Sequence, residues 1–376
     1  MTDEYPITGE ASARFERVRS AFAENFRAGN ELGGSFALWI DGALEIDLFG
    51  GYTDRKKQNP WTEETIACVY SCGKAVLSIM IARGVSAGLL DYDQPVARYW
   101  PEFAAAGKDK LTVAQMLSHQ GGLCGFPDEM DPADWLDASV ICARLAAMAP
   151  LWEIPATSGY HPQTVGFIAG ELIRRVSGQS VGTHLRRQSR EKNLLAFCGL
   201  SQAEMTRASY MPKPPKAPDL GELSEFKKIA FLKPWSSAAR VSRQDWSAAE
   251  IPASNMHTNA RSLAELLYPL ASGGSDTDGA QVLVPAVVEA ATKERVHGQD
   301  LVLPFDLSWA AGLMRNVRGH FGPNQTALGH AGFGGSCVVV DPDNRMSIAY
   351  VMNKMSAHLV GDPRALKLIE AVYACL

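Results

Sequence analysis

Two pairs of apolar runs, one near the start of the chain and one near its end, are each divided by a turn signal. Gly34 to Ile40 and Ala43 to Gly50 flank Asp41-Gly42, a dipeptide typical of tight β-hairpins. Residues 336–353 contain a second pair of runs around Asp341 to Arg345, which predicts a hairpin with a longer turn. Hairpins at opposite ends of a chain are most simply accommodated in one antiparallel sheet. The chain is therefore expected to leave this sheet and return to it.

Between the hairpins, apolar residues recur mainly at helical spacing, and helices are also expected near both ends of the chain. The expected helices are Ala11 to Ala28, Lys74 to Arg83, Thr112 to Leu117, Thr164 to Val176, Thr258 to Ala271 and Pro363 to Leu376. The charged, proline-bearing stretch Tyr210 to Asp219 is typical of a surface loop.

This pattern predicts an α+β fold, in which an antiparallel sheet is flanked by terminal helices and a mainly helical domain is inserted. With 376 residues, the chain is long enough for two or three domains. We expect residues 1–66 and 300–376 to form one discontinuous α/β domain, and residues 67–299 to form the helical domain. A cleft between two such parts is a common position for an active site.

The charge balance excludes several classes of function. Lys and Arg number 36 and Asp and Glu number 41, which gives a formal net charge of -5. Proteins that bind nucleic acid or an acidic membrane surface normally carry an excess of basic residues, so neither partner is expected. No apolar run reaches the roughly 18 residues that a membrane helix needs.

The N-terminus and the cysteines indicate the expected compartment. Residues 1–6 contain neither the basic nor the apolar segment of a secretory signal. The seven cysteines are scattered and include no Cys-x-x-Cys pair, which disfavours both a disulfide framework and a structural zinc site. We therefore expect a cytoplasmic protein with free thiols and with no metal ion or other cofactor.

Four serines are candidates for a nucleophile. Ser86 lies in a Gly-x-Ser-x-Gly motif, but an apolar helix precedes it where a nucleophile elbow needs a strand, so a helix end with a glycine stop is expected instead. Ser71, Ser189 and Ser224 each have a lysine three residues later. Ser189 and Ser224 lie among charged residues, as on solvated helix faces, whereas Ser71 is followed by the apolar segment 75–82.

A buried helix beginning at Ser71 suits catalysis for three physical reasons. Residues three apart share a helix face, so Lys74 can reach the Ser71 hydroxyl. Loss of hydration lowers the pKa of a lysine and makes it a proton acceptor. A helix N-terminus also presents free N–H groups to a developing anion. The alternative is that Ser71 only caps the helix and that Lys74 extends to water.

Ser71-Cys72-Gly73-Lys74, with Thr65 to Tyr70 before it, resembles the first motif of the serine β-lactamase superfamily. That superfamily also contains penicillin-binding D-alanyl-D-alanine peptidases and family VIII carboxylesterases. Gly88 to Val96 and Leu111 to Leu123 resemble two further segments of these proteins. The resemblance extends from the first hairpin to the closing helix, and it implies a β-lactamase/transpeptidase-like fold.

The second motif of the superfamily resembles Gly159-Tyr160-His161-Pro162. The resemblance implies that Tyr160 is the general base beside Lys74. An unperturbed tyrosine pKa near 10 is too high for that role, but a nearby ammonium favours the phenolate, so we expect one coupled Ser/Lys/Tyr unit. In β-lactamases the third residue of the motif is commonly Asn. Pro162 lacks that side-chain hydrogen bond, which brings this chain nearer to the esterase branch.

The third motif, Lys-Thr-Gly in β-lactamases and peptidases, corresponds to Gly329 to Ser336, at the start of the expected strand that begins at Cys337. His330 replaces the lysine, so a fixed positive charge is expected to be lost. The resemblance implies that His330, Gly332 and Phe333 bind substrate, and that the N–H groups of Ser71 and Phe333 form the oxyanion hole. No counterpart of the deacylating Glu of class A enzymes is identifiable.

These features predict a serine hydrolase that forms an acyl-enzyme on Ser71. The expected activity is that of a carboxylesterase on short-chain esters, with weak β-lactamase activity, so the partner is a small ester or β-lactam. The missing export signal, His330 and Pro162 favour an esterase. The alternatives are a non-hydrolytic penicillin-binding or scaffold protein on the same fold, and a D-alanyl-D-alanine peptidase. Because Cys72 adjoins the nucleophile, thiol reagents are expected to inhibit.

Overall fold

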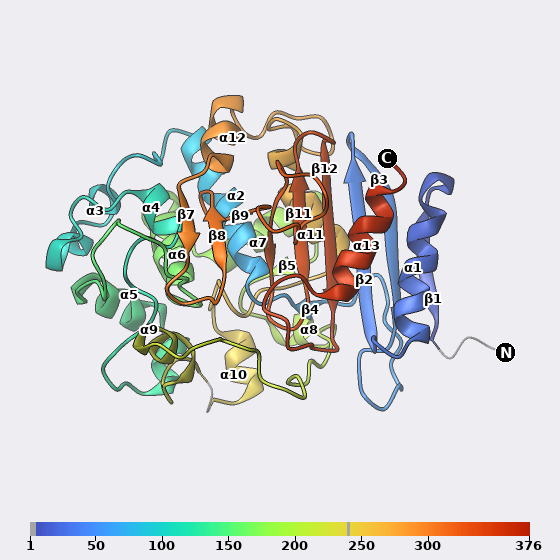
Figure 1. Cartoon of the computed structure of the whole chain (residues 1–376), viewed down its shortest axis with the longest axis horizontal. Helices are drawn as coiled ribbons and strands as arrows, with labels where there is room; N and C mark the ends of the chain where they lie inside the picture. Colours follow the sequence, from blue (N-terminus) through green and yellow to red (C-terminus); the bar gives the residue numbers. More distant parts are fainter. Residues whose placement is uncertain (1–4, 239–240) are drawn as a thin grey trace.

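A nine-stranded antiparallel sheet forms the centre of the computed structural model, which describes residues 5–238 and 241–376 (Figure 1). The strand order is β1-β3-β2-β12-β11-β10-β9-β8-β7. Part of the N-terminal stretch used to predict the compartment, residues 1–4, lies outside the described residues. The strands of this sheet are β1 (Ile7–Ala11), β2 (Gly33–Ile40), β3 (Ala43–Gly51), β7 (Val296–Gln299), β8 (Asp306–Trp309), β9 (Met314–Arg315), β10 (Leu328–Ala331), β11 (Cys337–Asp341) and β12 (Met346–Met352).

The two predicted hairpins lie side by side at the middle of the sheet, as expected from the sequence. Strand β2 pairs with β12 in antiparallel register, with Phe36 opposite Tyr350. The α+β prediction is confirmed. The sheet is larger than the hairpins indicate, because β1 extends it at one edge and β10 to β7 extend it at the other.

The central strands are covered on both faces, which explains why all eight residues of β2 are buried. Phe36 and Leu38 join the core formed with α1 (Glu16–Arg27) and α13 (Pro363–Tyr373), which pack together along one face (Figure 1). The intervening Ala37 and Trp39 join the core on the other face. There, α11 (Ala260–Ala271) packs against β2, β11 and β12.

Two helices, one near the N-terminus and one in the central segment, begin at different residues from those predicted. Ile7 to Ala11 pair with β3, so α1 begins at Glu16 and not at Ala11. Similarly, Thr258 belongs to a short strand, and Asn259 caps α11 by accepting a hydrogen bond from the Ser262 N–H, so that helix begins at Ala260. Local pairing and capping therefore decide both helix starts.

The segment between the hairpins is mainly helical, as predicted. Its longest helix, α2 (Cys72–Ser86), is buried over most of its length and packs against α6, α11, α12 and β10. The remaining helices and strands are β4 (Ala67–Cys68), α3 (Val96–Tyr99), α4 (Val113–Leu117), α5 (Ala138–Ala147), α6 (Thr164–Ser177), α7 (Val181–Lys192), β5 (Ala196–Phe197), α8 (Gln202–Met205), α9 (Glu225–Lys227), the π-helix η4 (Lys228–Leu232), α10 (Arg243–Ala248), β6 (His257–Thr258) and α12 (Pro285–Thr292), together with three short 3-10 helices.

The division into an α/β domain of residues 1–66 and 300–376 and a helical domain of residues 67–299 stays a prediction. The sheet also includes β7, and α11 from the central segment packs on it. None of the helices in the described ranges has the length and apolar character needed to cross a bilayer. The stretch Tyr210 to Asp219 has neither helix nor strand, as predicted.

Candidate active site

Ser71 occupies the turn between β4 and α2. The preceding residue, Tyr70, has a φ of 44°, a left-handed conformation that is uncommon for a residue with a side chain. Ser71 takes the N-cap position of α2, but its hydroxyl caps no helix N–H. The alternative in which Ser71 serves only as a helix cap is therefore wrong, and the hydroxyl is available for other contacts.

The Ser71 hydroxyl lies between two side chains that the sequence predicted beside it. Lys74 Nζ is 2.9 Å from Ser71 Oγ, and Tyr160 Oη is 2.7 Å from the same atom. The three residues come from the start of α2 and from the loop before α6. The structure thus brings together the first and second motifs, which are almost ninety residues apart.

Lys74 is buried, with 3% of its surface exposed, so it does not extend to water. Its amine also donates hydrogen bonds to two backbone carbonyls, that of Pro162 at 2.7 Å and that of Ala253 at 3.2 Å. Burial in the apolar helix α2 lowers the pKa of Lys74 well below its ordinary value. The group is therefore electrostatically suited to accept a proton.

Tyr160 is held by contacts to both its backbone and its ring. Its N–H donates to Asp300 Oδ1 at 2.9 Å, and its ring stacks on Trp309 with an interplanar angle of 11°. His119 packs edge-on against the same ring. Burial raises the pKa of Tyr160 above its ordinary value. This corrects the expected ammonium–phenolate pair, because desolvation disfavours the charged form of both Lys74 and Tyr160.

His161, whose role the sequence left open, joins two loops beside the site. Its Nδ1 donates to the Gly159 carbonyl at 2.6 Å, and its Nε2 accepts from the Leu123 N–H at 2.8 Å. Its own N–H donates to Nδ1 of His119. Burial lowers the pKa of His161 to about 3, so the ring is neutral. His119 and Asp300 are support residues that sequence reasoning missed, although His119 lies within a quoted family segment.

The third motif forms the end of β10 and a glycine turn, rather than only preceding a strand. Gly332 packs so closely against the Val69 carbonyl and Ser336 Oγ that a Cβ would collide with both. Ser336 Oγ donates to the Val69 carbonyl at 3.0 Å, and the Phe333 ring contacts the Tyr70 ring edge-on. These contacts bring the turn against the segment that carries the nucleophile.

Two backbone N–H groups of this region are free to bind an oxyanion. Neither the Ser71 N–H nor the Phe333 N–H has an acceptor within residues 5–238 and 241–376. These are the donors that the family resemblance implies. Acyl transfer needs free donors beside its nucleophile, and this role of the two N–H groups stays a prediction.

His330 lies in β10, and its side chain is completely buried in the protein. Its Nδ1 donates to the Ala331 carbonyl, and its Nε2 has no partner among the described residues. Burial lowers its pKa to about 3, so it carries no fixed positive charge. Neither His330 nor Gly332 lines the cavity above Ser71 that is described below. The structure therefore gives no support to the prediction that these two residues contact substrate.

A cavity of about 650 Å³ opens above Ser71 and Tyr160, and Phe333 forms part of its wall. Its apolar lining includes Met211, Leu220, Phe231, Leu232, Val241, Trp246, Leu303, Met314 and Val360. Sequence reasoning missed these pocket residues, because they come from loops and short elements without a motif. The described part of the chain has no group of three His, Cys, Asp or Glu residues that could hold a metal ion.

The other candidate serines lie elsewhere. Ser86 ends α2, and its hydroxyl accepts from the Val284 N–H, so the predicted helix end is confirmed. Ser189 is buried and donates to the Ala196 carbonyl, so a solvated face was the wrong expectation. Ser224 caps α9, and Lys227 is buried with its amine bound to two carbonyls. Hydrogen bonds to nearby backbone carbonyls satisfy both Ser189 and Lys227 despite their charged neighbours.

Cys72 adjoins Ser71 but faces away from solvent. Its thiol is fully buried and donates to the His330 carbonyl. Burial raises its pKa to about 12, so little reactive thiolate forms at neutral pH. The expected inhibition by thiol reagents therefore receives no support from this residue.

A serine hydroxyl shared by a buried lysine and a tyrosine, at the start of a helix that packs on an antiparallel sheet, defines a serine hydrolase of the β-lactamase/transpeptidase-like fold. The chain belongs to the Beta-lactamase family, whose model matches residues 19–371.

Three comparisons illustrate this relationship. The esterase/beta-lactamase LipL of Mycobacterium tuberculosis is 31% identical, over 94% of this chain and 84% of the relative. A penicillin-binding protein homolog from Caulobacter crescentus has a TM-score of 0.95 at 49% identity, covering 99% of this chain and 100% of the other. A family VIII carboxylesterase has a TM-score of 0.90 at 36% identity, with the same coverage.

Proposed function

We propose that this protein forms an acyl-enzyme on Ser71 and acts as a carboxylesterase on short-chain esters, with weak β-lactamase activity. The observation that carries this proposal is the Ser71 hydroxyl held at hydrogen-bond distance from both Lys74 and Tyr160. A nucleophile in contact with a group of lowered pKa is the basic requirement of covalent catalysis.

Lys74 Nζ has three oxygen partners, and the lowered pKa favours its neutral form, in which one of these contacts reverses. A neutral amine has two N–H donors and one lone pair. The carbonyls of Pro162 and Ala253 accept the two N–H groups, which leaves the lone pair directed to Ser71 Oγ. Ser71 then donates its proton to Lys74 and accepts a hydrogen bond from Tyr160. In this arrangement Lys74 is the first proton acceptor, and Tyr160 is the neutral partner.

The reaction follows from these positions. As Ser71 Oγ bonds to the substrate carbonyl carbon, its proton passes to Lys74, and the N–H groups of Ser71 and Phe333 bind the oxyanion. The leaving alcohol receives that proton through Tyr160 when the ester C–O bond breaks. A water molecule then attacks the acyl carbonyl carbon, and one of its protons passes through Tyr160 to Lys74. When the bond from the acyl group to Ser71 Oγ breaks, Ser71 Oγ takes this proton back and the carboxylic acid is released.

Two features support ester over lactam as the main substrate. His330 is neutral and buried where β-lactamases carry a lysine, and Pro162 presents only its carbonyl, to Lys74. The similarity to a carboxylesterase agrees with this preference. The seven free cysteines fit the proposed cytoplasmic location.

Penicillin binding without turnover is the second candidate function. The similarity to the penicillin-binding protein homolog, at 49% identity over nearly the whole chain, favours it. A D-alanyl-D-alanine peptidase remains the third possibility for this fold.

One set of assays separates the candidates. Wild-type protein and Ser71→Ala are incubated with nitrophenyl acetate and butyrate, nitrocefin, a fluorescent penicillin, and a D-alanyl-D-alanine peptide. The proposal expects turnover of the nitrophenyl esters that Ser71→Ala abolishes, with much slower nitrocefin hydrolysis. Stable penicillin labelling without ester turnover would favour the binding protein, and release of D-alanine would favour the peptidase.

A further inference from the structure

We propose that Arg364 is a positioning residue for catalysis: it holds the glycine turn 332–335 and thereby directs the Phe333 N–H at the oxyanion. This inference rests on the proposed function, because it assigns a task to the turn only if Ser71 generates an oxyanion. Arg364 is the second residue of α13, far from Phe333 in the sequence.

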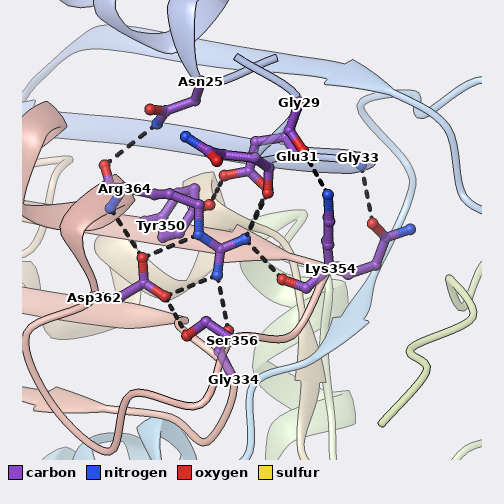
Figure 2. A network of polar contacts seen from close by, with 12 residues as sticks. Asn25, Gly29, Glu31, Gly33, Gly334, Tyr350, Lys354, Ser356, Asp362 and Arg364 are labelled. Atoms are coloured by element: carbon purple, nitrogen blue, oxygen red, sulfur yellow. Dashed lines mark hydrogen bonds and ion pairs between the residues drawn. The ribbon is translucent and has the colours of Figure 1, made fainter. Parts of the chain in front are cut away.

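The guanidinium of Arg364 contacts the turn directly, as Figure 2 shows. Arg364 Nη2 donates to the Gly334 carbonyl at 2.9 Å. The Ser356 N–H donates to the same carbonyl, also at 2.9 Å. This carbonyl belongs to the residue after Phe333, so its two donors hold the backbone one residue beyond the Phe333 N–H.

The glycines of the turn fit closely against this support. A Cβ on Gly335 would collide with Arg364 Nη2 and with Asp362 Oδ2, and Gly335 has a φ of +126°. A Cβ on Gly334 would lie 2.8 Å from two side-chain atoms of Met355. The turn is thus shaped to rest on the ion pair between Arg364 and Asp362, whose Nη2 to Oδ2 distance is 2.8 Å.

Arg364 is itself fixed from several sides (Figure 2). Its Nε donates to Asp362 Oδ1, and its Nη1 contacts Glu31 Oε2, the Asn30 carbonyl and the Lys354 carbonyl at 3.1, 3.2 and 2.7 Å. Every N–H group of the guanidinium therefore has an acceptor in the protein. A lysine cannot reproduce this fork, because it offers one point of donation.

Arg364 is not positioned to touch substrate. Its side chain is 8% exposed, and it does not line the cavity above Ser71. The opposite end of the turn is held by other groups, since the Gly332 N–H donates to the Ser336 carbonyl at 2.7 Å. Arg364 therefore acts on the reaction through the backbone of the turn.

The test compares Arg364→Lys, Arg364→Gln and Asp362→Asn with Tyr350→Phe. The Tyr350 hydroxyl donates to Glu31 in the same buried network but does not contact the turn, so its variant is the matched control. Each protein is measured for kcat and KM with nitrophenyl butyrate and for the inhibition constant of phenylboronic acid, which forms a tetrahedral adduct with an active serine. All values are normalised to active sites titrated with a fluorophosphonate.

We expect the Arg364 and Asp362 variants to lose on the order of 10–100-fold in kcat and to weaken boronate binding in parallel, with little change in KM. Tyr350→Phe should lose stability but keep kcat and boronate affinity per active site. Unchanged kcat and boronate affinity in any folded Arg364 or Asp362 variant would overturn the inference. If wild-type protein hydrolyses no ester, the proposed function fails instead, and the two failures are distinct.

Discussion

Lys74 Nζ lies 2.9 Å from Ser71 Oγ within a helix that is buried over most of its length. The same burial that lowers the pKa of the lysine raises the pKa of Tyr160. Both shifts favour the uncharged form of each group around one hydroxyl. In the proposed mechanism, the lysine is the base that accepts the serine proton, and the tyrosine supplies a hydrogen bond and a path for the proton.

Replacing Lys74 tests its role as proton acceptor. Lys74→Met keeps a similar length without a basic nitrogen, so we expect kcat/KM to fall by about 10²–10⁴-fold, the usual effect of losing a general base. Lys192→Met is the matched control, because Lys192 also follows a serine by three residues but pairs with Asp276 and Asp278 on the surface. Steady-state ester hydrolysis measures both variants, and normal activity in Lys74→Met would refute this role.

The pH dependence of kcat/KM follows from the direction of the Lys74 shift. Burial lowers its pKa, so the neutral, proton-accepting form increases as pH rises through a value well below the ordinary 10.5. We expect activity to rise with pH through one limb and then level off, since burial raises the pKa of Tyr160 and delays its ionisation. His330 and His161, with pKa values lowered to about 3, should add no limb between pH 5 and 8.

A profile of kcat/KM from pH 5 to 10 with a nitrophenyl ester checks this expectation, with spontaneous hydrolysis subtracted at each pH. His330→Asn should show the same limb as wild type. Activity that falls as pH rises through this range would show that a protonated group, and not the neutral lysine, drives the reaction.

Tyr160→Phe removes the hydroxyl and keeps the ring, so it tests the role of the hydroxyl alone. The phenyl ring can still stack on Trp309, so we expect a loss of about 1 kcal/mol in stability for the missing hydrogen bond. Activity should fall more strongly, by about 10²-fold or more, because the proton path to the leaving group is broken. Tyr92→Phe is the control, since the buried Tyr92 hydroxyl has no partner among the described residues. Chemical denaturation and ester kinetics measure the two effects, and equal activity in both variants would contradict the role of Tyr160.

Gly332→Ala tests the close packing of the oxyanion turn. A Cβ at this position collides with the Val69 carbonyl and Ser336 Oγ, so we expect a destabilisation of about 1–3 kcal/mol and reduced kcat per folded molecule. Gly170→Ala, within α6, offers the contrast, because its Cβ would make ordinary contacts with Val181 and Pro252 and should be neutral or stabilising. Thermal unfolding followed by kinetics on both variants checks this difference, and an unperturbed Gly332→Ala would refute the packing argument.

The parts of the fold that carry strong local signals could be predicted from the sequence. The Asp41-Gly42 turn and the apolar runs around it led to the correct hairpin, and its pairing with the C-terminal hairpin followed from topology. Strands β1 and β7 to β10 were missed because most are short and lack a clear alternation of apolar residues. Their pairing depends on neighbours in the sheet and not on their own composition.

The candidate site also has parts that the sequence predicts and parts that it does not. Ser71, Lys74 and Tyr160 belong to motifs, and the structure brings them together. The charge states were less predictable, because they depend on burial that arises only after folding. His330 is the clearest case of such burial. Its place in the motif suggested contact with substrate, whereas in the structure it lies in β10 and is completely buried.

The most direct test of the account is to identify the acylated residue. Wild-type protein and Ser71→Ala are treated with a fluorophosphonate and separately with a slow-turnover ester, and the adducts are located by peptide mass spectrometry. The account predicts one adduct on Ser71 in the wild-type protein and none in Ser71→Ala, together with loss of ester hydrolysis. An adduct on Ser86 or another residue, or full hydrolysis by Ser71→Ala, would contradict it.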